Sequence, residues 1–413
     1  MDINSIRRQF PLLQPNLIYL DNAATTQKPQ VVLDAMDQFY KTSNANINRG
    51  VHKLAEAATL AYDDARKVVQ KFINAQKSHE VIFTRNTTES INLVAKTYGR
   101  SILKKDDVIV LTILEHHSNI VPWLQLKDEL GVRIEWVDIN NDGMIDLDQY
   151  KKILADHPVK LVSVSAVSNV LGIRSPIETM IELAHTKGAV IMIDAAQMAL
   201  HERMDVQKLD CDFLAFSSHK MYGPTGIGVL YGKENLLEKM PPFLGGGDMI
   251  GEVTTNHFTT AELPRKFEAG TPAIAEAVGL RTAMEWIEQI GFDEIQKHEQ
   301  SLLTHILDIL QRATVKPVTI LGALNPFQKV SCISFTLDGI HPHDLTQLLS
   351  QEGVMLRAGH HCTQPLHKRL GVLASSRLSV GVYNSAEELD QFAKLFEESI
   401  HQLDGSHSAA RSA

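Results

Sequence analysis

Short apolar runs separated by helix-length segments dominate the first part of the chain. Seven runs are predicted strands, at residues 80–84, 108–112, 133–137, 159–165, 189–194, 212–217 and 227–231. Most are hydrophobic at nearly every position, which is typical of strands covered on both faces. The helical spacing of apolar residues between them, as at 177–185, suits right-handed crossovers. The pattern predicts an α/β fold with a mostly parallel, seven-stranded sheet flanked by helices.

The pattern changes after a helix predicted at 273–290. A helix to residue 312, strands near 318, 331–337, 353–357 and 376–380, and helices from 343 and 386 indicate a smaller α+β domain at the C-terminal end. We expect a large domain at 17–285, a small domain formed by 1–16 and 286–404, and a flexible tail at 405–413. The length of 413 residues fits two domains. The polar stretch at 245–272 is too long for an ordinary connection and is predicted to be functional.

Composition excludes several classes of protein. The net charge of −9 and the absence of a Lys/Arg block argue against a nucleic-acid-binding surface. No apolar run is long enough to cross a bilayer, and the N-terminus lacks the apolar core of a signal peptide. Cys211, Cys332 and Cys362 are too widely spaced for a disulfide framework or a metal site. We therefore expect a cytoplasmic, reduced protein with no metal and no membrane contact.

Two charged residues follow buried strands of the predicted sheet. Asp194 ends the run at 189–194, and Lys220 lies in a polar step between the run at 212–217 and a Gly-Pro turn. Ligands of open α/β sheets bind at the carboxyl ends of strands, so both side chains can share one pocket. A carboxylate for a pyridinium nitrogen and a lysine for a Schiff base are what pyridoxal 5'-phosphate (PLP) requires. The two residues alone leave open a PLP site or a plain ion pair that caps two strands.

Polar residues at the ends of other predicted strands are further candidates for cofactor binding, and each has a second interpretation. Thr87 and Thr88 open a helix after the first strand, where hydroxyl and N–H groups can hold a phosphate or simply cap the helix. His116 can stack on an aromatic cofactor or lie solvated in a loop. Asn169 can hydrogen-bond a cofactor oxygen or serve as a turn residue before Gly172.

The stretch at 354–365 holds the best candidate nucleophile. Cys362 lies in a polar loop near Arg357, His360 and His361, and positive neighbours favour a thiolate. The other two cysteines lie in apolar strand patterns and are predicted to be buried. Arg377, on the next strand, can take a substrate carboxylate bidentately or form a surface ion pair.

Several separated motifs together resemble one family. They are Asn22-Ala-Ala-Thr-Thr, Arg49-Gly-Val-His, Thr87-Thr-Glu, Glu115-His-His-Ser-Asn-Ile-Val-Pro-Trp, Val167-Ser-Asn-Val-Leu-Gly, Asp194-Ala-Ala-Gln, Ser217-Ser-His-Lys-Met-Tyr-Gly-Pro-Thr-Gly-Ile-Gly, Phe267-Glu-Ala-Gly-Thr-Pro and Arg357-Ala-Gly-His-His-Cys. In this order the chain resembles, from about residue 10 to 403, the cysteine desulfurases of the class V aminotransferase group. More narrowly, it is similar to the SUF-type, group II branch, which implies PLP fold type I.

The resemblance implies a role for each candidate. Lys220 would form the Schiff base and move the Cα proton, Asp194 would pair with the pyridinium nitrogen, and Cys362 would accept the sulfur. The remaining cofactor contacts would come from Gln197, His116, Thr88, Ser217 and His219, with Thr271 supplied by the neighbouring subunit of a homodimer. The substrate carboxylate would be bound by Asn169 and Arg377, with Arg357 close by.

The implied reaction converts L-cysteine to L-alanine and passes an enzyme-bound persulfide to an acceptor protein of the SUF system for iron–sulfur cluster assembly. Asn48, where relatives often have histidine, and Thr363, where alanine is common, depart from the family pattern. For His341 and His343 one hypothesis is an acceptor-facing surface, and the alternative is a solvated turn before a helix.

Alternatives stay open at this point. A selenocysteine lyase or cysteine sulfinate desulfinase, acting on L-selenocysteine or the sulfinate, needs Cys362 less, because selenide or sulfite can leave without thiolate attack. A transaminase would not need it at all. A non-catalytic sulfur-transfer scaffold is disfavoured by the presence of Lys220, Asp194 and Cys362 together.

Overall fold

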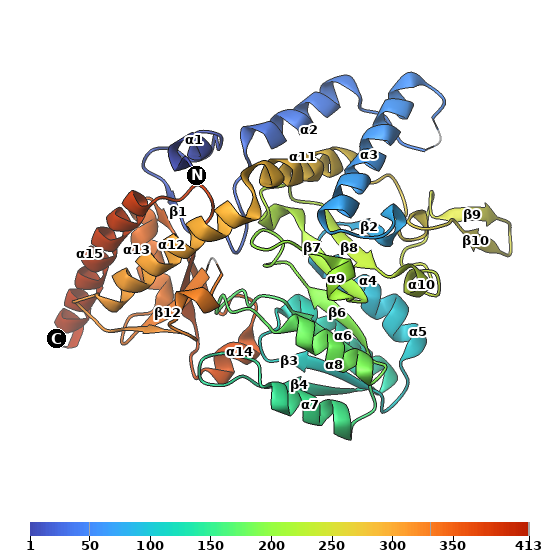
Figure 1. Ribbon diagram of the computed structural model, residues 1–413. Coiled ribbons are helices and arrows are strands. Elements are labelled where there is room, and N and C mark those ends of the chain that lie inside the picture. The colour runs from blue at the N-terminus through green and yellow to red at the C-terminus, as the bar shows by residue number, and fades with distance from the viewer. Residues whose placement is uncertain (49, 331, 412–413) are drawn as a thin grey trace.

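The computed structural model describes residues 1–48, 50–330 and 332–411. Arg49 of one family motif and Ser331 of one predicted strand lie outside the described residues. The chain forms a larger α/β part and a smaller part that carries the C-terminus, and a long helix, α12 (Phe292–Gln311), runs between the two (Figure 1).

The large part is built on the seven-stranded sheet that the apolar runs predict. Its strands, in spatial order, are β2 (Val81–Thr84), β8 (Gly228–Gly232), β7 (Phe213–Ser217), β6 (Val190–Asp194), β5 (Val159–Ser165), β3 (Val108–Thr112) and β4 (Arg133–Val137). All are parallel except β8, which is antiparallel to both neighbours. The turn that joins β7 to β8 is too short for a crossover helix, so the chain must return antiparallel.

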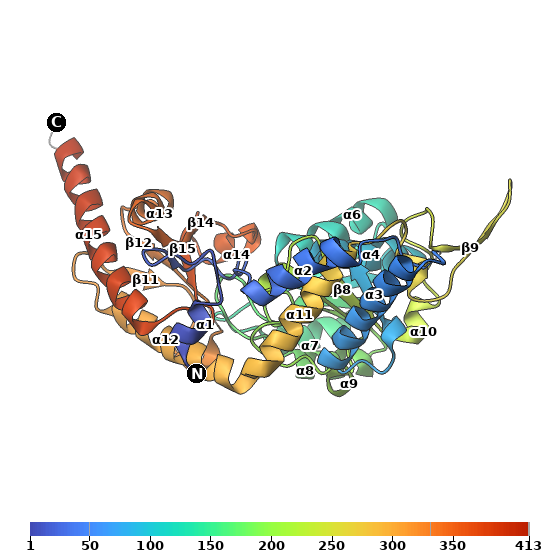
Figure 2. The same cartoon turned by 90° about the horizontal axis from the view of Figure 1, so that it is seen from above.

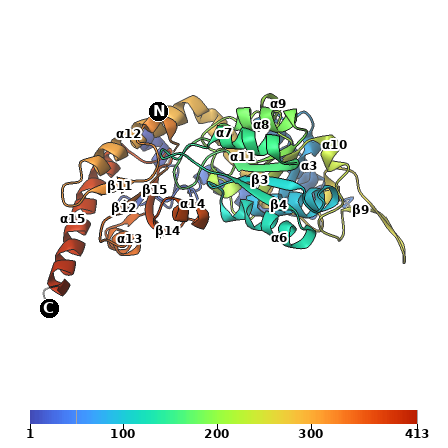
Figure 3. The ribbon, with the colours of Figure 1, turned by 90° about the horizontal axis from the view of Figure 1, so that it is seen from below.

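Both faces of this sheet are buried, as the continuous hydrophobicity predicts. In β3, Val108 and Val110 pack into one core while Ile109 and Leu111 pack into another on the opposite face. Figure 3 shows α6 (Val121–Leu130) on one face and α7 (Leu147–Asp156) with α8 (Ile177–Thr186) on the other. The α/β assignment with a mostly parallel sheet is confirmed.

The remaining helices of the large part surround the sheet. They are α2 (Gln30–Thr42), α3 (Lys53–Phe72), α4 (Thr87–Val94), α5 (Arg100–Ile102), α9 (Val206–Leu209), α10 (Glu234–Leu237) and α11 (Ile274–Ile290). The longest of these, α3, starts where the His52 side chain accepts the N–H of Ala55. Its buried apolar side chains recur at helical spacing and so form one stripe against the core, namely Ala55, Ala58, Tyr62, Ala65, Val69 and Phe72.

The small part has its own core and a four-stranded antiparallel sheet. The order is β11 (Val318–Ile320), β12 (Cys332–Leu337), β15 (Ser375–Ser379) and β14 (Arg357–Gly359). The helices α13 (Pro342–Gln351), α14 (Gln364–Arg369) and α15 (Ala386–Arg411) accompany α12 here. Two short strands, β1 (Ile18–Tyr19) and β13 (Val354–Met355), pair in parallel at its edge. This matches the predicted α+β domain.

The division of the N-terminal segment differs from the expected one at residue 17. Ile6 and Phe10, around α1 (Ile3–Arg7), belong to the larger core, where Phe10 packs edge-on against Trp286. Ile18 and Leu20 instead belong to the core of the small part, because β1 pairs with β13. At the other end, α15 continues to Arg411, through most of the segment predicted to be a flexible tail. The remaining domain bounds stay a prediction.

The polar stretch at 245–272 contains a hairpin of β9 (Ile250–Val253) and β10 (Phe258–Thr260), which projects away from the rest of the molecule (Figure 2). Its strands are mostly exposed. Among the described residues, no helix combines the length and apolar character needed to cross a membrane.

Candidate active site

One cavity of about 430 Å³ lies where the carboxyl ends of β5, β6 and β7 meet the small part. Every residue predicted for the site lines it except Thr271: Thr88, His116, Asn169, Asp194, Gln197, Ser217, His219, Lys220, Arg357, Cys362 and Arg377. Thr271 lines a separate hollow beside Phe83 and Glu276. Its assignment to a neighbouring subunit's site therefore stays a prediction.

Lys220 and Asp194 meet in this cavity because their strands are neighbours in the sheet. Asp194 is the last residue of β6, and Lys220 lies three residues after β7 ends. Burial lowers the pKa of Lys220 to about 8, opposed by the charges of Asp194 and Cys362. Burial also raises the pKa of Asp194, whose Oδ1 accepts the N–H of Ala196 at 2.9 Å. Lys220 Nζ makes no hydrogen bond within the described part of the chain, so the amine is available to a ligand.

The start of α4 and Ser217 form a polar wall of the cavity, here called the cup. The N–H and hydroxyl of Thr87 lie 2.8 and 2.6 Å from Ser217 Oγ, and the Asn86 side chain accepts the N–H of Glu89 at 2.9 Å. Thr88 lies between these two contacts at the cavity wall. A Cβ on Gly228 would lie 2.6 Å from Asn86 Cα, so a glycine allows β8 to approach the helix start this closely. The cup can hold a phosphate.

His219 lines the same cavity and is held in its neutral form. Burial lowers its pKa to about 4, assisted by the positive charges of Lys220 and Lys28. Its Nδ1 lies 3.2 Å from Thr25 Oγ1, while its backbone oxygen accepts the N–H of Thr26 at 2.9 Å. The segment that carries the Asn22 motif thus holds the histidine in place.

His116 is also neutral and has a fixed orientation. Burial lowers its pKa to about 3, and the nearby Lys220 adds to this effect. Its Nδ1 accepts the N–H of Ser118 at 3.1 Å, which leaves the proton on Nε2. Gln197, on another wall, donates from Nε2 to the backbone oxygen of Ala23 at 2.8 Å. A neutral imidazole of this kind can stack on a planar cofactor.

A buried carboxylate, Glu115, lies directly beside this histidine and was not predicted as a site residue. It accepts hydrogen bonds of 2.6 Å each from Thr112 Oγ1, Asn119 Nδ2 and Ser165 Oγ. Burial raises its pKa to about 7. The Glu-His-His motif places Glu115 in the sequence, but only the fold brings Ser165 to it.

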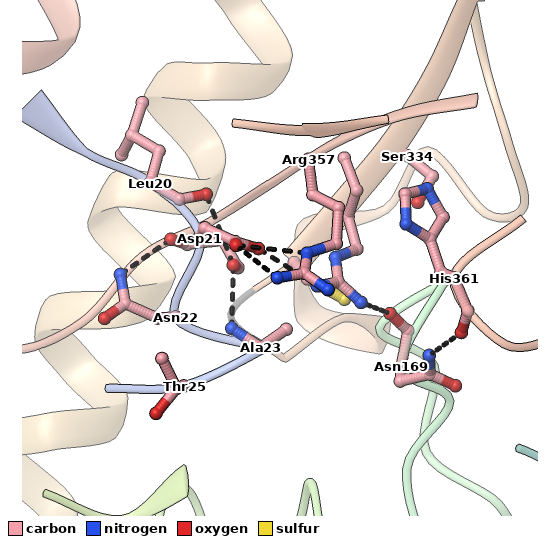
Figure 4. Close-up of polar contacts among 12 residues, drawn as sticks. Leu20, Asp21, Asn22, Ala23, Thr25, Asn169, Ser334, Arg357 and His361 are labelled. Carbon is pink, nitrogen blue, oxygen red and sulfur yellow. Dashed lines mark hydrogen bonds and ion pairs between the residues drawn. The ribbon is translucent and has the colours of Figure 1, made fainter. Parts of the chain in front are cut away.

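Two arginines, Arg357 and Arg377, also line the cavity, and Figure 4 shows Arg357 beside Asp21. Arg377 is buried and donates from Nη1 to the backbone oxygen of Asn169 at 2.8 Å. Arg357 is half-exposed and donates from Nε to Asp21 Oδ2 at 3.1 Å, while its Nη2 lies 3.0 Å from the same oxygen. Asp21 also pairs with Arg377 Nη2, at 3.2 Å from Oδ1. Sequence reasoning missed Asp21, although it directly precedes the Asn22 motif.

Cys362 lies at the exposed rim of the cavity in an unusual backbone conformation. His361 and Cys362 are consecutive left-handed residues, with φ of 49° and 58°. Two contacts from the large part hold them: the N–H of His117 donates to Cys362 O, and Asn169 Nδ2 donates to His361 O, both at 2.8 Å. Cys362 is exposed, whereas Cys211 and Cys332 are buried as predicted. Of the three thiols, only that of Cys362 lines the cavity.

The two departures from the family pattern have defined contacts. Asn48 has a φ of 71° and donates from Nδ2 to Asp248 at 2.7 Å, outside the cavity. Thr363 donates from Oγ1 to the backbone oxygen of His360 at 2.8 Å, which closes the turn after Cys362. The rings of His341 and His343 stack on each other at the start of α13.

Comparisons with known proteins agree with this geometry. The family model described as Aminotransferase class-V matches residues 18–392. A probable cysteine desulfurase of Halalkalibacterium halodurans is 45% identical over 399 residues, which are 95% of this chain and 97% of the relative. The apo structure of a cysteine desulfurase from Thermococcus onnurineus NA1 is 40% identical, with a TM-score of 0.92 over 97% of this chain and 98% of that one. A crystal structure of a cysteine desulfurase (S-sulfonic acid) from Escherichia coli is 38% identical, with a TM-score of 0.91 over 97% and 99%.

Both the matched family and these relatives cover nearly the whole chain, including the sheet, the cavity and the small part. The chain therefore belongs to the class-V aminotransferase family and, within it, to the cysteine desulfurases.

Proposed function

We propose that this protein is a PLP-dependent L-cysteine desulfurase of the SUF type. It converts L-cysteine to L-alanine, keeps the sulfur on Cys362 as a persulfide, and passes it to an acceptor protein for iron–sulfur cluster assembly. The observation that carries the proposal is that Lys220, Asp194 and Cys362 line one cavity.

The residues of the cavity suit both the pyridinium nitrogen and the phosphate of PLP. The buried Asp194 keeps one carboxylate oxygen free of hydrogen bonds within the described residues, and a pyridinium nitrogen would satisfy it. Thr88 and Ser217 of the cup, together with His219, suit the phosphate, and the unpaired amine of Lys220 suits the Schiff base. When bound, PLP supplies a sink for the electron pair left on the substrate's Cα.

Lys220 is placed to take the proton from Cα and to return a proton afterwards. A general base works best when its pKa lies near the working pH. Burial brings the pKa of Lys220 to about 8, much closer to neutrality than its ordinary value of 10.5. Arg377 and Asn169, at the other end of the cavity, are the groups that can hold the substrate carboxylate and so orient Cα toward the lysine.

Cys362 completes the reaction as the nucleophile. Its Sγ attacks the substrate Sγ, and a sulfur–sulfur bond forms as the Cβ–Sγ bond breaks with its electron pair left on carbon. Cβ then takes up a proton. The sum is L-cysteine plus the Cys362 thiol giving L-alanine plus the Cys362 persulfide, which balances without an external oxidant.

The exposure of Cys362 supports transfer to a partner, because an acceptor thiol can reach the rim without opening the core. Homodimer formation is proposed for the same enzyme, since Thr271 lies outside the cavity of its own chain. A cytoplasmic location stays a prediction from the free thiols.

The test is alanine release from L-cysteine with PLP and a reductant, by the parent protein and by Cys362→Ser. Cys211→Ser, at a buried thiol remote from the cavity, is the matched control. We expect Cys362→Ser to abolish release and the control to retain it. The parent and Cys362→Ser are also assayed with L-selenocysteine, and here Cys362→Ser should keep its activity.

Equal alanine release from L-cysteine by parent and Cys362→Ser would refute the persulfide route. Release from selenocysteine or cysteine sulfinate alone would instead identify a lyase or desulfinase. Formation of pyruvate-type keto acids without alanine would identify a transaminase.

A further inference from the structure

The two arginines of the cavity face each other across a strand pair. Arg357 on β14 and Arg377 on β15 are direct partners in the antiparallel register. Like charges directly opposite each other destabilise a sheet. The carboxylate of Asp21 pairs with both arginines. Its Oδ2 contacts Arg357 (Figure 4), and its Oδ1 contacts Arg377. The three side chains together keep one net positive charge.

The two guanidinium groups are used differently. Arg357 directs its Nε and Nη2 toward Asp21, so this pair of donors is not available to a second carboxylate. Arg377 gives one N–H of Nη1 to Asn169 and one of Nη2 to Asp21, while its buried Nε has no partner among the described residues. Since a guanidinium carries five N–H donors, Arg377 keeps three unused. The side chain of Arg377 is 3% exposed and that of Arg357 50%.

Asp21 is itself held rigidly. Its backbone bridges to Ser379 of β15, and its backbone oxygen accepts the N–H of Ala24 at 3.1 Å. The next residues reach the cofactor end of the cavity, where Ala23 O accepts from Gln197 and Thr25 Oγ1 donates to His219 O. The backbone that carries Asp21 is therefore held both by the small part and by residues at the other end of the cavity.

We propose that Asp21 is a positioning residue of the substrate-carboxylate subsite, which binds Arg357 side-on and thereby leaves Arg377 as the guanidinium that receives the α-carboxylate of the amino acid. The inference rests on the proposed function and deepens it. With one net positive charge, the subsite matches the single negative charge of an α-carboxylate. Without Asp21, the two facing guanidinium groups repel each other, and the half-exposed Arg357 is free to turn to solvent.

The experiment measures ligand binding to the holoenzyme by calorimetry, with L-alanine and L-alaninamide as probes. The two probes share the amine and the methyl group, and only L-alanine carries the carboxylate. In Asp21→Asn, we expect L-alanine to bind about tenfold more weakly, the effect of one weakened charge-assisted hydrogen bond. L-alaninamide should bind as it does to the parent. The KM for L-cysteine should rise about as much, with kcat changed less.

Asp138→Asn is the matched control, because Asp138 also pairs with an arginine, Arg369, at 2.7 Å but lies outside the cavity. It should leave both probes unchanged. Asp21→Glu keeps the charge and moves it by one methylene, so its effect on L-alanine should lie between parent and Asp21→Asn. If Asp21→Asn does not fold, the same binding measurements are made with Asp21→Glu.

Two results would overturn the inference. Tighter binding of L-alanine by Asp21→Asn would show that Asp21 competes with the substrate. Equal weakening of both probes would show a general structural role. Failure of the proposed function gives a different result, because then the parent itself releases no alanine from L-cysteine.

Discussion

Replacing Glu115 with glutamine tests the electrostatics of the buried carboxyl group that precedes His116 in the sequence. Glu115 is fully buried, and burial raises its pKa from an ordinary 4.5 to about 7. The folded protein thus holds this proton more tightly than the unfolded chain does. Its contribution to stability is complete below about pH 4.5 and is lost as the pH rises through about 7.

The difference between these two pKa values corresponds to about 3 kcal/mol in the free energy of unfolding. Glutamine has nearly the same shape and carries no charge. It can accept from Asn119 and Ser165 with its oxygen, while the hydroxyl of Thr112 turns to accept from its amide. The stability that the parent loses between pH 4.5 and 8 should therefore shrink by about 3 kcal/mol in Glu115→Gln.

Denaturant unfolding of both proteins at pH 4.5 and pH 8 measures this double difference, in which effects independent of pH cancel. Glu182→Gln, on the exposed face of α8, is the control and should leave the parent's pH dependence unchanged. An identical pH dependence in the parent and Glu115→Gln would refute the reasoning, because it would mean that the buried carboxyl titrates alike in both states.

Three further perturbations have definite expected outcomes. Uptake of PLP by the apoprotein, followed by absorbance, should accelerate with pH and level off above about 8, because burial lowers the pKa of Lys220 to that value and the neutral amine reacts; a rate still rising at pH 10 would contradict this. Gly228→Ala should lose about 1–3 kcal/mol of stability, measured by denaturant unfolding, and should bind PLP more weakly, because its Cβ would meet Asn86. Glu268→Gln should lose about 3–5 kcal/mol in the same unfolding assay. Arg66 donates to both oxygens of the Glu268 carboxylate at 2.7 Å and would be left buried without its charge partner. A loss below 1 kcal/mol would contradict a stabilising role for this buried ion pair.

The sequence predicts those parts of the site that depend on local rules. Asp194 ends one apolar strand and Lys220 closely follows the next, and the carboxyl ends of such strands meet at one edge of the sheet. Cys362 differs from the other two cysteines by its polar surroundings. These features lie within short segments, so the roles of these residues can be predicted before the fold is known.

Residues whose role depends on distant partners could not be found in this way. Asp21 pairs with arginines more than 330 residues further along the chain. The sequence also gives no sign that β1, directly after residue 17, pairs with β13 of the small part. Glu115 belongs to a predicted motif, but the hydrogen bond from Ser165 requires β3 and β5 to be neighbours.

The left-handed conformation of His361 and Cys362 bears on how the Cys362 thiol is held in place. Non-glycine residues in this conformation are unfavourable by about 1–2 kcal/mol each, so the loop does not keep its shape through its own sequence alone. Its two hydrogen-bond anchors, His117 and Asn169, belong to the large part, while the loop itself belongs to the small one. The position of the Cys362 thiol therefore depends on how the two parts dock, and a separation of the two parts would break both hydrogen bonds and free the loop.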